Sequence, residues 1–125
     1  MQLKLVHNVT ASEREQADPA RSVFEHWAYM TGRTKRCIYG PKRARLIEQW
    51  LRYYDAQTLM LACEGMAASA WHAGDNPRGT RCDEIELMLR DEAHIERFAS
   101  EGESLRDKMA RRVRRIQSAE KAAQD

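Results

Sequence analysis

The sequence contains no long apolar run, so it offers no segment of roughly 20 apolar residues that would cross a bilayer. Its first ten residues, MQLKLVHNVT, also lack the apolar stretch of a secretion signal. We therefore expect a cytoplasmic protein without a membrane partner. The 125 residues are 42% hydrophobic and 32% charged, which predicts one small domain with a thin core.

Cysteine is scarce, and the glycine-rich motifs that cradle phosphates are absent. Cys37, Cys63 and Cys82 cannot all pair, and none has the close Cys or His neighbour that zinc sites use. We expect reduced thiols, no metal and no cofactor. Without a nucleotide-binding loop or a recognisable nucleophile and base, the sequence predicts a protein that is not an enzyme.

Two clusters of polar residues could be either chemical sites or structural elements. The carboxylates between Asp83 and His94 resemble a magnesium-dependent nuclease site, but Glu84 and Glu86 would face different directions on a helix. Asp83 and Asp91 instead fit helix N-caps. In the turn-rich stretch WHAGDNPRGTR, we expect His72, Asp75 and Asn76 to hydrogen-bond the loop backbone.

Apolar residues recur every three or four positions, which predicts an all-α fold, a small single-domain bundle of about five to six helices. Helix starts are expected at Asp18-Pro19, Pro41 and Asp55, and a helix end at Gly32. We predict a flexible arm over residues 1–17, a helical core domain over 18–100 and a C-terminal basic amphipathic helix and tail over 101–125. Gly102 should break or bend the chain, and the end should fray from about Ser118.

The predicted core follows from the same spacing, and Gly65 should let another helix approach its own closely. The expected core residues are Ala20, Val23, Phe24, Trp27, Met30, Leu46, Ile47, Trp50, Leu51, Tyr54, Leu59, Met60, Cys63, Met66 or Ala67, Ile85, Met88, Leu89, Ile95 and Phe98. A further apolar set lies on the last helix: Leu105, Met109, Val113 and Ile116. That set could join two copies as an antiparallel pair, which is the basis for an expected homo-oligomer.

Charge is unevenly distributed along the chain. Residues 33–52 hold seven cations and one anion, and residues 104–125 hold seven cations and three anions. Residues 83–103 between them hold eight anions and two cations. Clustered Arg and Lys neutralise phosphates and release counterions, whereas a basic run on a helix is also a common solvated face. The acidic block either pairs with a basic block or faces away from it.

The candidate nucleic-acid-binding residues are the cations of the first basic segment together with those of the turn-rich stretch. They are Arg33, Lys35, Arg36, Lys42, Arg43, Arg45, Arg52, Arg78 and Arg81. Near the N-terminal end of a helix, cations oppose the helix dipole, so their presence there favours an anionic partner.

Four aromatic residues are not clearly assigned to the core. Tyr29, Tyr39, Tyr53 and Trp71 would stack on unpaired bases if they lie beside the cations. The alternative is ordinary packing at helix ends, which we favour for Trp71.

Five short motifs follow one another at fixed spacings between residues 23 and 99. They are VFEHW around Trp27, PKR at the start of the second helix, YD before the third, WHAGDNPRG in the loop, and IELMLRDEAHIERF. With these motifs the segment resembles the C-terminal domain of phage and prophage replication-initiation proteins of the replisome-organiser type. It is more distantly similar to the helical domains of DnaD-type primosome proteins.

The resemblance implies a noncatalytic helical module used in starting DNA replication. Its expected partners are DNA, either single-stranded or origin duplex, or the replicative helicase or its loader, or both. A different class stays open: a small phage-encoded protein-interaction or inhibitor module that targets a host replication or defence protein without binding DNA.

Overall fold

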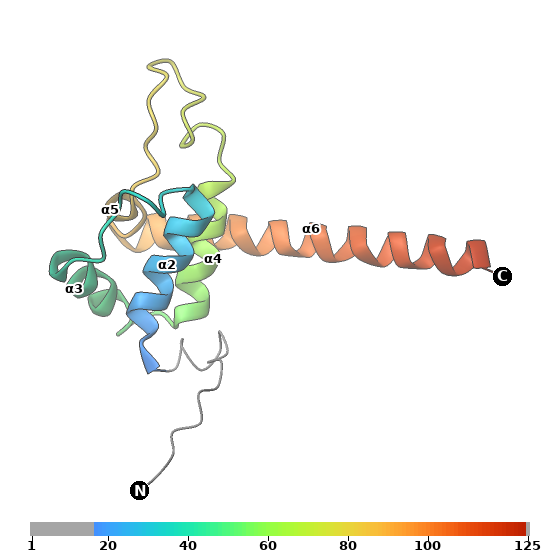
Figure 1. Ribbon diagram of the computed structural model, residues 1–125, viewed down its shortest axis with the longest axis horizontal. Coiled ribbons are helices and arrows are strands. Elements are labelled where there is room, and N and C mark those ends of the chain that lie inside the picture. The colour runs from blue at the N-terminus through green and yellow to red at the C-terminus, as the bar shows by residue number, and fades with distance from the viewer. Residues whose placement is uncertain (1–16, 125) are drawn as a thin grey trace, which may run out of the picture.

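The computed structural model describes residues 17–124, and within that range the chain forms five α-helices and no strand. Labelled as in Figure 1, they are α2 (Pro19–Thr31), α3 (Pro41–Trp50), α4 (Ala56–Ala67), α5 (Ile85–Met88) and α6 (Glu92–Gln124). The predicted all-α class is confirmed. The predicted arm lies almost entirely outside the described residues. Fraying from Ser118 is not observed, because α6 continues to Gln124.

The helix boundaries follow from local chemistry. The Asp18, Asp55 and Asp91 carboxylates accept hydrogen bonds from backbone N–H groups three residues later, as N-caps do. Gly32 ends α2 with a φ of 74°, a left-handed conformation that glycine adopts without steric penalty. The predicted cap at Asp83 is wrong: α5 begins after Glu84, and Asp83 has a different role.

The core lies where α2 packs against α4 and α4 crosses α6 (Figure 1). Trp27, Leu59, Met66, Ile95 and Phe98 are fully buried there. Most of the predicted core residues are buried or half-buried. Met30 is the exception in α2, because its side chain is partly exposed while Ala28 faces the interior.

Gly65 and Gly102 meet where α4 crosses α6. A Cβ at Gly65 would fall far inside contact distance of the Phe98 carbonyl oxygen, and one at Gly102 would collide with the Leu61 carbonyl oxygen. The expected close approach at Gly65 is therefore confirmed. The expected break at Gly102 is wrong, because this glycine lies inside the continuous helix α6 and lets its backbone touch α4.

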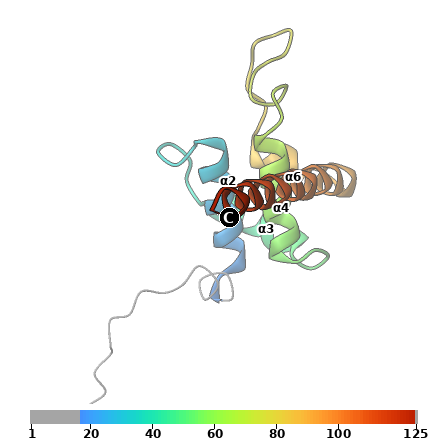
Figure 2. The same cartoon turned by 90° about the vertical axis from the view of Figure 1, so that its right-hand side faces the viewer.

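Two parts of the chain project from the packed helices. We call residues 18–102 the head, which includes the α4–α5 loop but not the second half of α6. The second half of α6 extends away as a single helix, and the loop between α4 and α5 extends in another direction, as both ribbon views show (Figures 1 and 2). From Glu103 to Gln124 only Leu105 is even half-buried. The predicted boundary at residue 100 thus falls inside one helix, although burial ends at Gly102.

Candidate nucleic-acid interface

The first turns of α3 carry exposed cations beside uncapped backbone N–H groups. Gly40 occupies the N-cap position and contributes no side-chain hydrogen bond. Lys42, Arg43 and Arg45 line a surface hollow of about 370 Å³ along this side of α3, together with Glu86, whose carboxylate pairs with Arg43. A helix N-terminus attracts anions through its dipole and its unpaired N–H groups, and nearby cations add to that attraction. The arrangement suits a phosphate group.

Six of the nine predicted cations have no carboxylate within ion-pair distance in residues 17–124. Five of them, Lys35, Arg36, Lys42, Arg52 and Arg78, are exposed and make no side-chain hydrogen bond with a described residue. Arg45 is exposed and donates from Nε to the Pro41 carbonyl oxygen over 3.3 Å. These six can receive phosphates without first breaking an ion pair.

Three of the nine predicted cations are paired with carboxylates of the acidic block. Arg33 Nη2 lies 2.6 Å from Asp83 Oδ1, and Arg81 Nη2 lies 2.8 Å from Asp83 Oδ2. Arg43 Nε lies 2.9 Å from Glu86 Oε1. Part of the acidic block therefore neutralises part of the first basic segment, the first of the two alternatives.

Asp83 holds together segments that are far apart in the sequence. It is 3% exposed, and its backbone carbonyl accepts a hydrogen bond of 2.9 Å from Trp27 Nε1. Arg81, bound to the Asp83 carboxylate, also donates to the Thr31 carbonyl oxygen at the end of α2. Burial alone would raise the pKa of Asp83, but hydrogen bonds from Arg81 and Arg33 outweigh it and hold the pKa below its ordinary value. Arg33 and Arg81 thus have a structural role.

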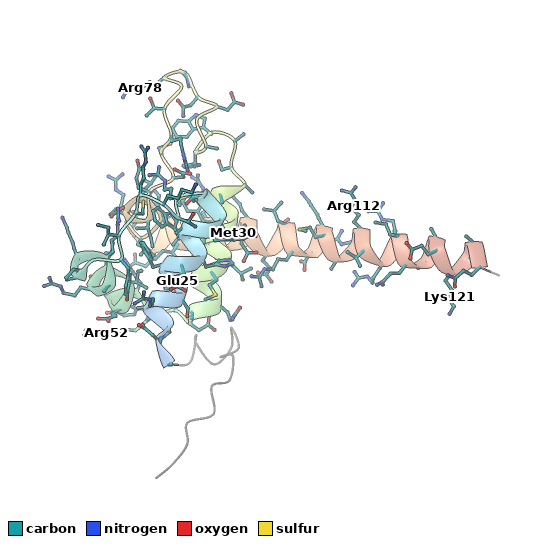
Figure 3. All side chains as sticks on the ribbon, viewed as in Figure 1. Glu25, Met30, Arg52, Arg78, Arg112 and Lys121 are labelled. Atoms are coloured by element: carbon teal, nitrogen blue, oxygen red, sulfur yellow. The ribbon has the colours of Figure 1, made fainter. Side chains whose placement is uncertain are left out.

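The predicted cations do not form one surface. Arg52 and Arg78 lie at opposite ends of the head, with Arg78 near the tip of the α4–α5 loop (Figure 3). A single nucleic-acid strand that contacts both would have to pass across the head. The group around the start of α3 is the more compact set.

The projecting half of α6 adds four cations that the site prediction omitted. Arg111, Arg112, Arg114 and Arg115 are exposed, have no ion pair with any described residue, and lie far from the head, as Arg112 illustrates in Figure 3. The run RRVRR was visible in the sequence as part of a net charge of +4 over residues 104–125. That run is the sequence signal from which this second basic surface could have been predicted.

Three of the four unassigned aromatic residues are exposed: Tyr29, Tyr53 and Trp71. Tyr39 instead packs on the core, with its ring centroid 5.1 Å from that of Phe24. At Trp71 the ring packs against His72, with the two ring centroids 5.2 Å apart, and the residue is still 55% exposed.

Of the polar loop residues expected to hydrogen-bond the loop backbone, one side chain does so. Asn76 hydrogen-bonds the loop backbone, as expected, whereas His72 is buried and bonds Ser69 Oγ through Nδ1 over 2.7 Å. Burial, with a smaller contribution from the charge of Arg97, lowers the pKa of His72. The imidazole is therefore a neutral packing element at pH 7.

Within residues 17–124, no three His, Cys, Asp or Glu side chains gather closely enough to hold a metal ion. Over the same range, no helix combines the length and the apolar character that a bilayer crossing needs. No protein-family model, no curated protein and no solved structure matches the chain.

Proposed function

We propose that this protein is a noncatalytic phage replication-initiation module that binds the DNA backbone. The observation that carries the proposal is the set of exposed cations at the start of α3, Lys42 and Arg45, next to uncapped N–H groups. Backbone binding needs unpaired cations that reach phosphates, and it needs no catalytic group. The sequence resemblance supplies the replication context.

The cations of α6 support the same function from a second position. A straight helix with four neighbouring arginines and no carboxylate partner among the described residues can lie along a phosphate backbone. The two basic surfaces lie on opposite sides of the α2 and α4 pair (Figure 1), so each is a separate candidate contact for DNA.

A protein partner is the second candidate, and a different observation favours it. The projecting half of α6 carries an exposed apolar set, Met109, Val113 and Ile116, which lies outside the buried core of the described chain. An unpartnered apolar helix face is typical of helix-in-groove recognition. The partner would be a replicative helicase, its loader, a host protein, or a second copy of this chain.

A salt series of DNA binding tests the first candidate. We expect Lys42→Gln with Arg45→Gln to weaken binding to every DNA sequence, because two phosphate contacts are lost. The slope of log affinity against log salt should fall by roughly 0.7 to 0.9 for each lost contact. Fluorescence anisotropy with single-stranded and duplex oligonucleotides at several salt concentrations measures both quantities.

The matched control removes the same charge elsewhere. Arg21→Gln with Arg97→Gln takes away two exposed cations that already pair with Glu25 and Glu101 on their own helices. We expect this variant to bind DNA like the unmodified protein. Equal losses in both variants, or no DNA binding at low salt, would reject the backbone-binding function. A stoichiometric protein partner that resists nuclease treatment would then favour the second candidate.

A further inference from the structure

We propose that the pocket on the α4–α5 loop, built around Trp71, Pro77 and Cys82, receives one unpaired nucleobase of a single-stranded nucleic acid. The proposal rests on the proposed function and names the form of nucleic acid that is bound. The pocket has a volume of about 410 Å³ and is completed by Asn76, Arg78 and Thr80.

Trp71 differs from the other two tryptophans of the chain. Trp27 and Trp50 are buried, and each donates its indole N–H to a backbone carbonyl, of Asp83 and Leu89 respectively. More than half of Trp71 is exposed, and its indole N–H has no partner in the described chain. The exposed part of the indole is a flat aromatic surface on which another ring can stack.

The loop that carries Trp71 is held by backbone hydrogen bonds, such as Cys82 N–H to the His72 carbonyl oxygen, and by the side chain of Asn76. Asn76 Nδ2 donates to the carbonyl oxygens of Trp71 and Thr80, over 2.8 and 2.7 Å. Asn76 Oδ1 accepts from the backbone N–H groups of Arg78 and Thr80, each over 3.2 Å. The amide thus uses two donors and one acceptor to tie three parts of the loop together. A pocket formed in advance avoids the entropy loss of ordering the loop on binding.

The walls of the pocket suit a flat, uncharged ring. Burial, with a smaller contribution from the charge of Glu84, raises the pKa of the Cys82 thiol, so the sulfur is neutral at pH 7. With the indole of Trp71 and the ring of Pro77, it forms an apolar interior. No carboxylate lines this pocket.

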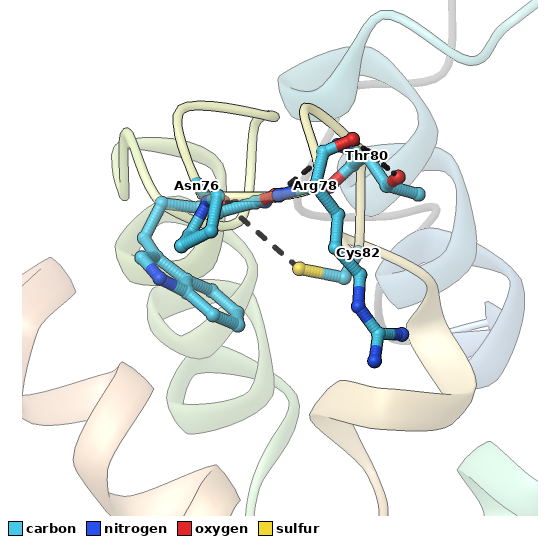
Figure 4. Close-up of a pocket in the computed structure, with 6 residues that line it drawn as sticks. Asn76, Arg78, Thr80 and Cys82 are labelled. Carbon is cyan, nitrogen blue, oxygen red and sulfur yellow. Dashed lines mark hydrogen bonds between the residues drawn. The ribbon is translucent and has the colours of Figure 1, made fainter.

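Arg78 supplies the charge that selects a nucleotide over an apolar peptide side chain. It extends from the loop alongside Cys82 (Figure 4) and has no ion pair with any described residue. A base stacked on Trp71 would leave its own phosphate at the rim, where Arg78 can reach it. Bases inside a duplex are stacked on both faces, so only an unpaired base can enter such a pocket.

Trp71→Ala tests the proposal against an aromatic control. We expect it to weaken binding to an oligothymidylate of about 16 nucleotides by roughly 5- to 100-fold, the effect of losing one stacked base. Trp71→Phe keeps a stacking ring and should lose less than about threefold. Binding to a duplex should change in neither variant. Tyr29→Ala and Tyr53→Ala, which remove exposed aromatic rings outside the pocket, should bind like the unmodified protein.

Tryptophan fluorescence gives a second readout on the intact protein. Because Trp71 is the exposed tryptophan, oligothymidylate should quench the emission of the unmodified protein and not that of Trp71→Phe. Unchanged single-strand affinity in Trp71→Ala, or equal loss on single strand and duplex, would overturn the pocket. The proposed function fails separately if Lys42→Gln with Arg45→Gln leaves DNA binding unchanged while Trp71→Ala weakens single-strand binding. If the unmodified protein binds neither form, both proposals fail.

Discussion

Among single side chains, Asp83 has the strongest influence on how the charges of this protein are used. It binds Arg33 and Arg81, and it supplies the carbonyl that accepts the buried indole N–H of Trp27. Arg33 and Arg43 also lie over the Trp27 ring, each 5.8 Å from its centroid. Cations that resemble a nucleic-acid patch in the sequence therefore cover and fasten the core.

We expect Asp83→Asn to lower the free energy of unfolding by about 3 kcal/mol at pH 7, because it leaves two arginines without their buried counter-charge. Chemical denaturation measures this loss. Asp75→Asn, at an exposed carboxylate of the same loop, should change stability by less than about 0.5 kcal/mol. A small effect at Asp83 would contradict the structural role.

The same ion pairs predict a dependence on pH. The pKa of Asp83 is lower in the folded state than in the unfolded state, so its stabilising contribution is present above about pH 4 and is lost as pH falls through the folded pKa. The difference in unfolding free energy between the unmodified protein and Asp83→Asn should therefore shrink in acid. Glu64, whose pKa is lowered by its hydrogen bond to Arg106, adds a similar loss in both proteins.

Between helices, the crossing of α4 and α6 depends on two glycines. In an isolated helix, alanine is more favourable than glycine by about 1 kcal/mol. At this crossing the added methyl group would collide with carbonyl oxygens of the facing helix backbone, which cannot rotate away as a side chain can. The steric term is the larger one, so the glycines stabilise the packing despite their poor helix propensity.

Gly65→Ala and Gly102→Ala should each lower the free energy of unfolding by about 2 kcal/mol or more. Ser100→Ala is the matched control, since it adds an alanine to an exposed position of α6 and should be nearly neutral. Thermal and denaturant unfolding monitored by circular dichroism would check all three. A neutral Gly102→Ala would mean that the helices are not in backbone contact.

The molecule as a whole divides into a head that contains the core and a helix that adds surface without adding burial. Residues 103–124, the described part beyond Gly102, contribute no fully buried side chain. Arg106 still contacts the head, because it donates from Nε to Glu64 Oε1 over 2.7 Å. The exposed residues at the end of α6 can therefore be deleted, and their binding tested, without unfolding the head.

Ending the chain after Met109 should leave the midpoint of thermal unfolding within a few degrees, since the removed part buries no core residue. If DNA lies along α6, removing Arg111, Arg112, Arg114 and Arg115 should lower the salt slope by up to roughly 3 to 4. Light scattering on both chains tests self-association: a mass that falls to one copy on truncation would place the contact on α6. If truncation changes neither the salt slope of DNA binding nor the mass from light scattering, both contacts lie outside the deleted part of α6.

Local signals in the sequence determined where α2, α3, α4 and α6 begin, where α2 ends, and which faces of these helices are apolar. Caps at Asp18, Asp55 and Asp91 act within three residues, and the apolar spacing of a helix is independent of its neighbours. The tertiary structure alone decided which cations are paired, that Gly102 serves a crossing, and that Trp71 is exposed. These outcomes depend on partners distant in sequence: Arg33 meets Asp83 across 50 positions and Gly102 meets Leu61 across 41, and spacing along a chain carries no information about such meetings.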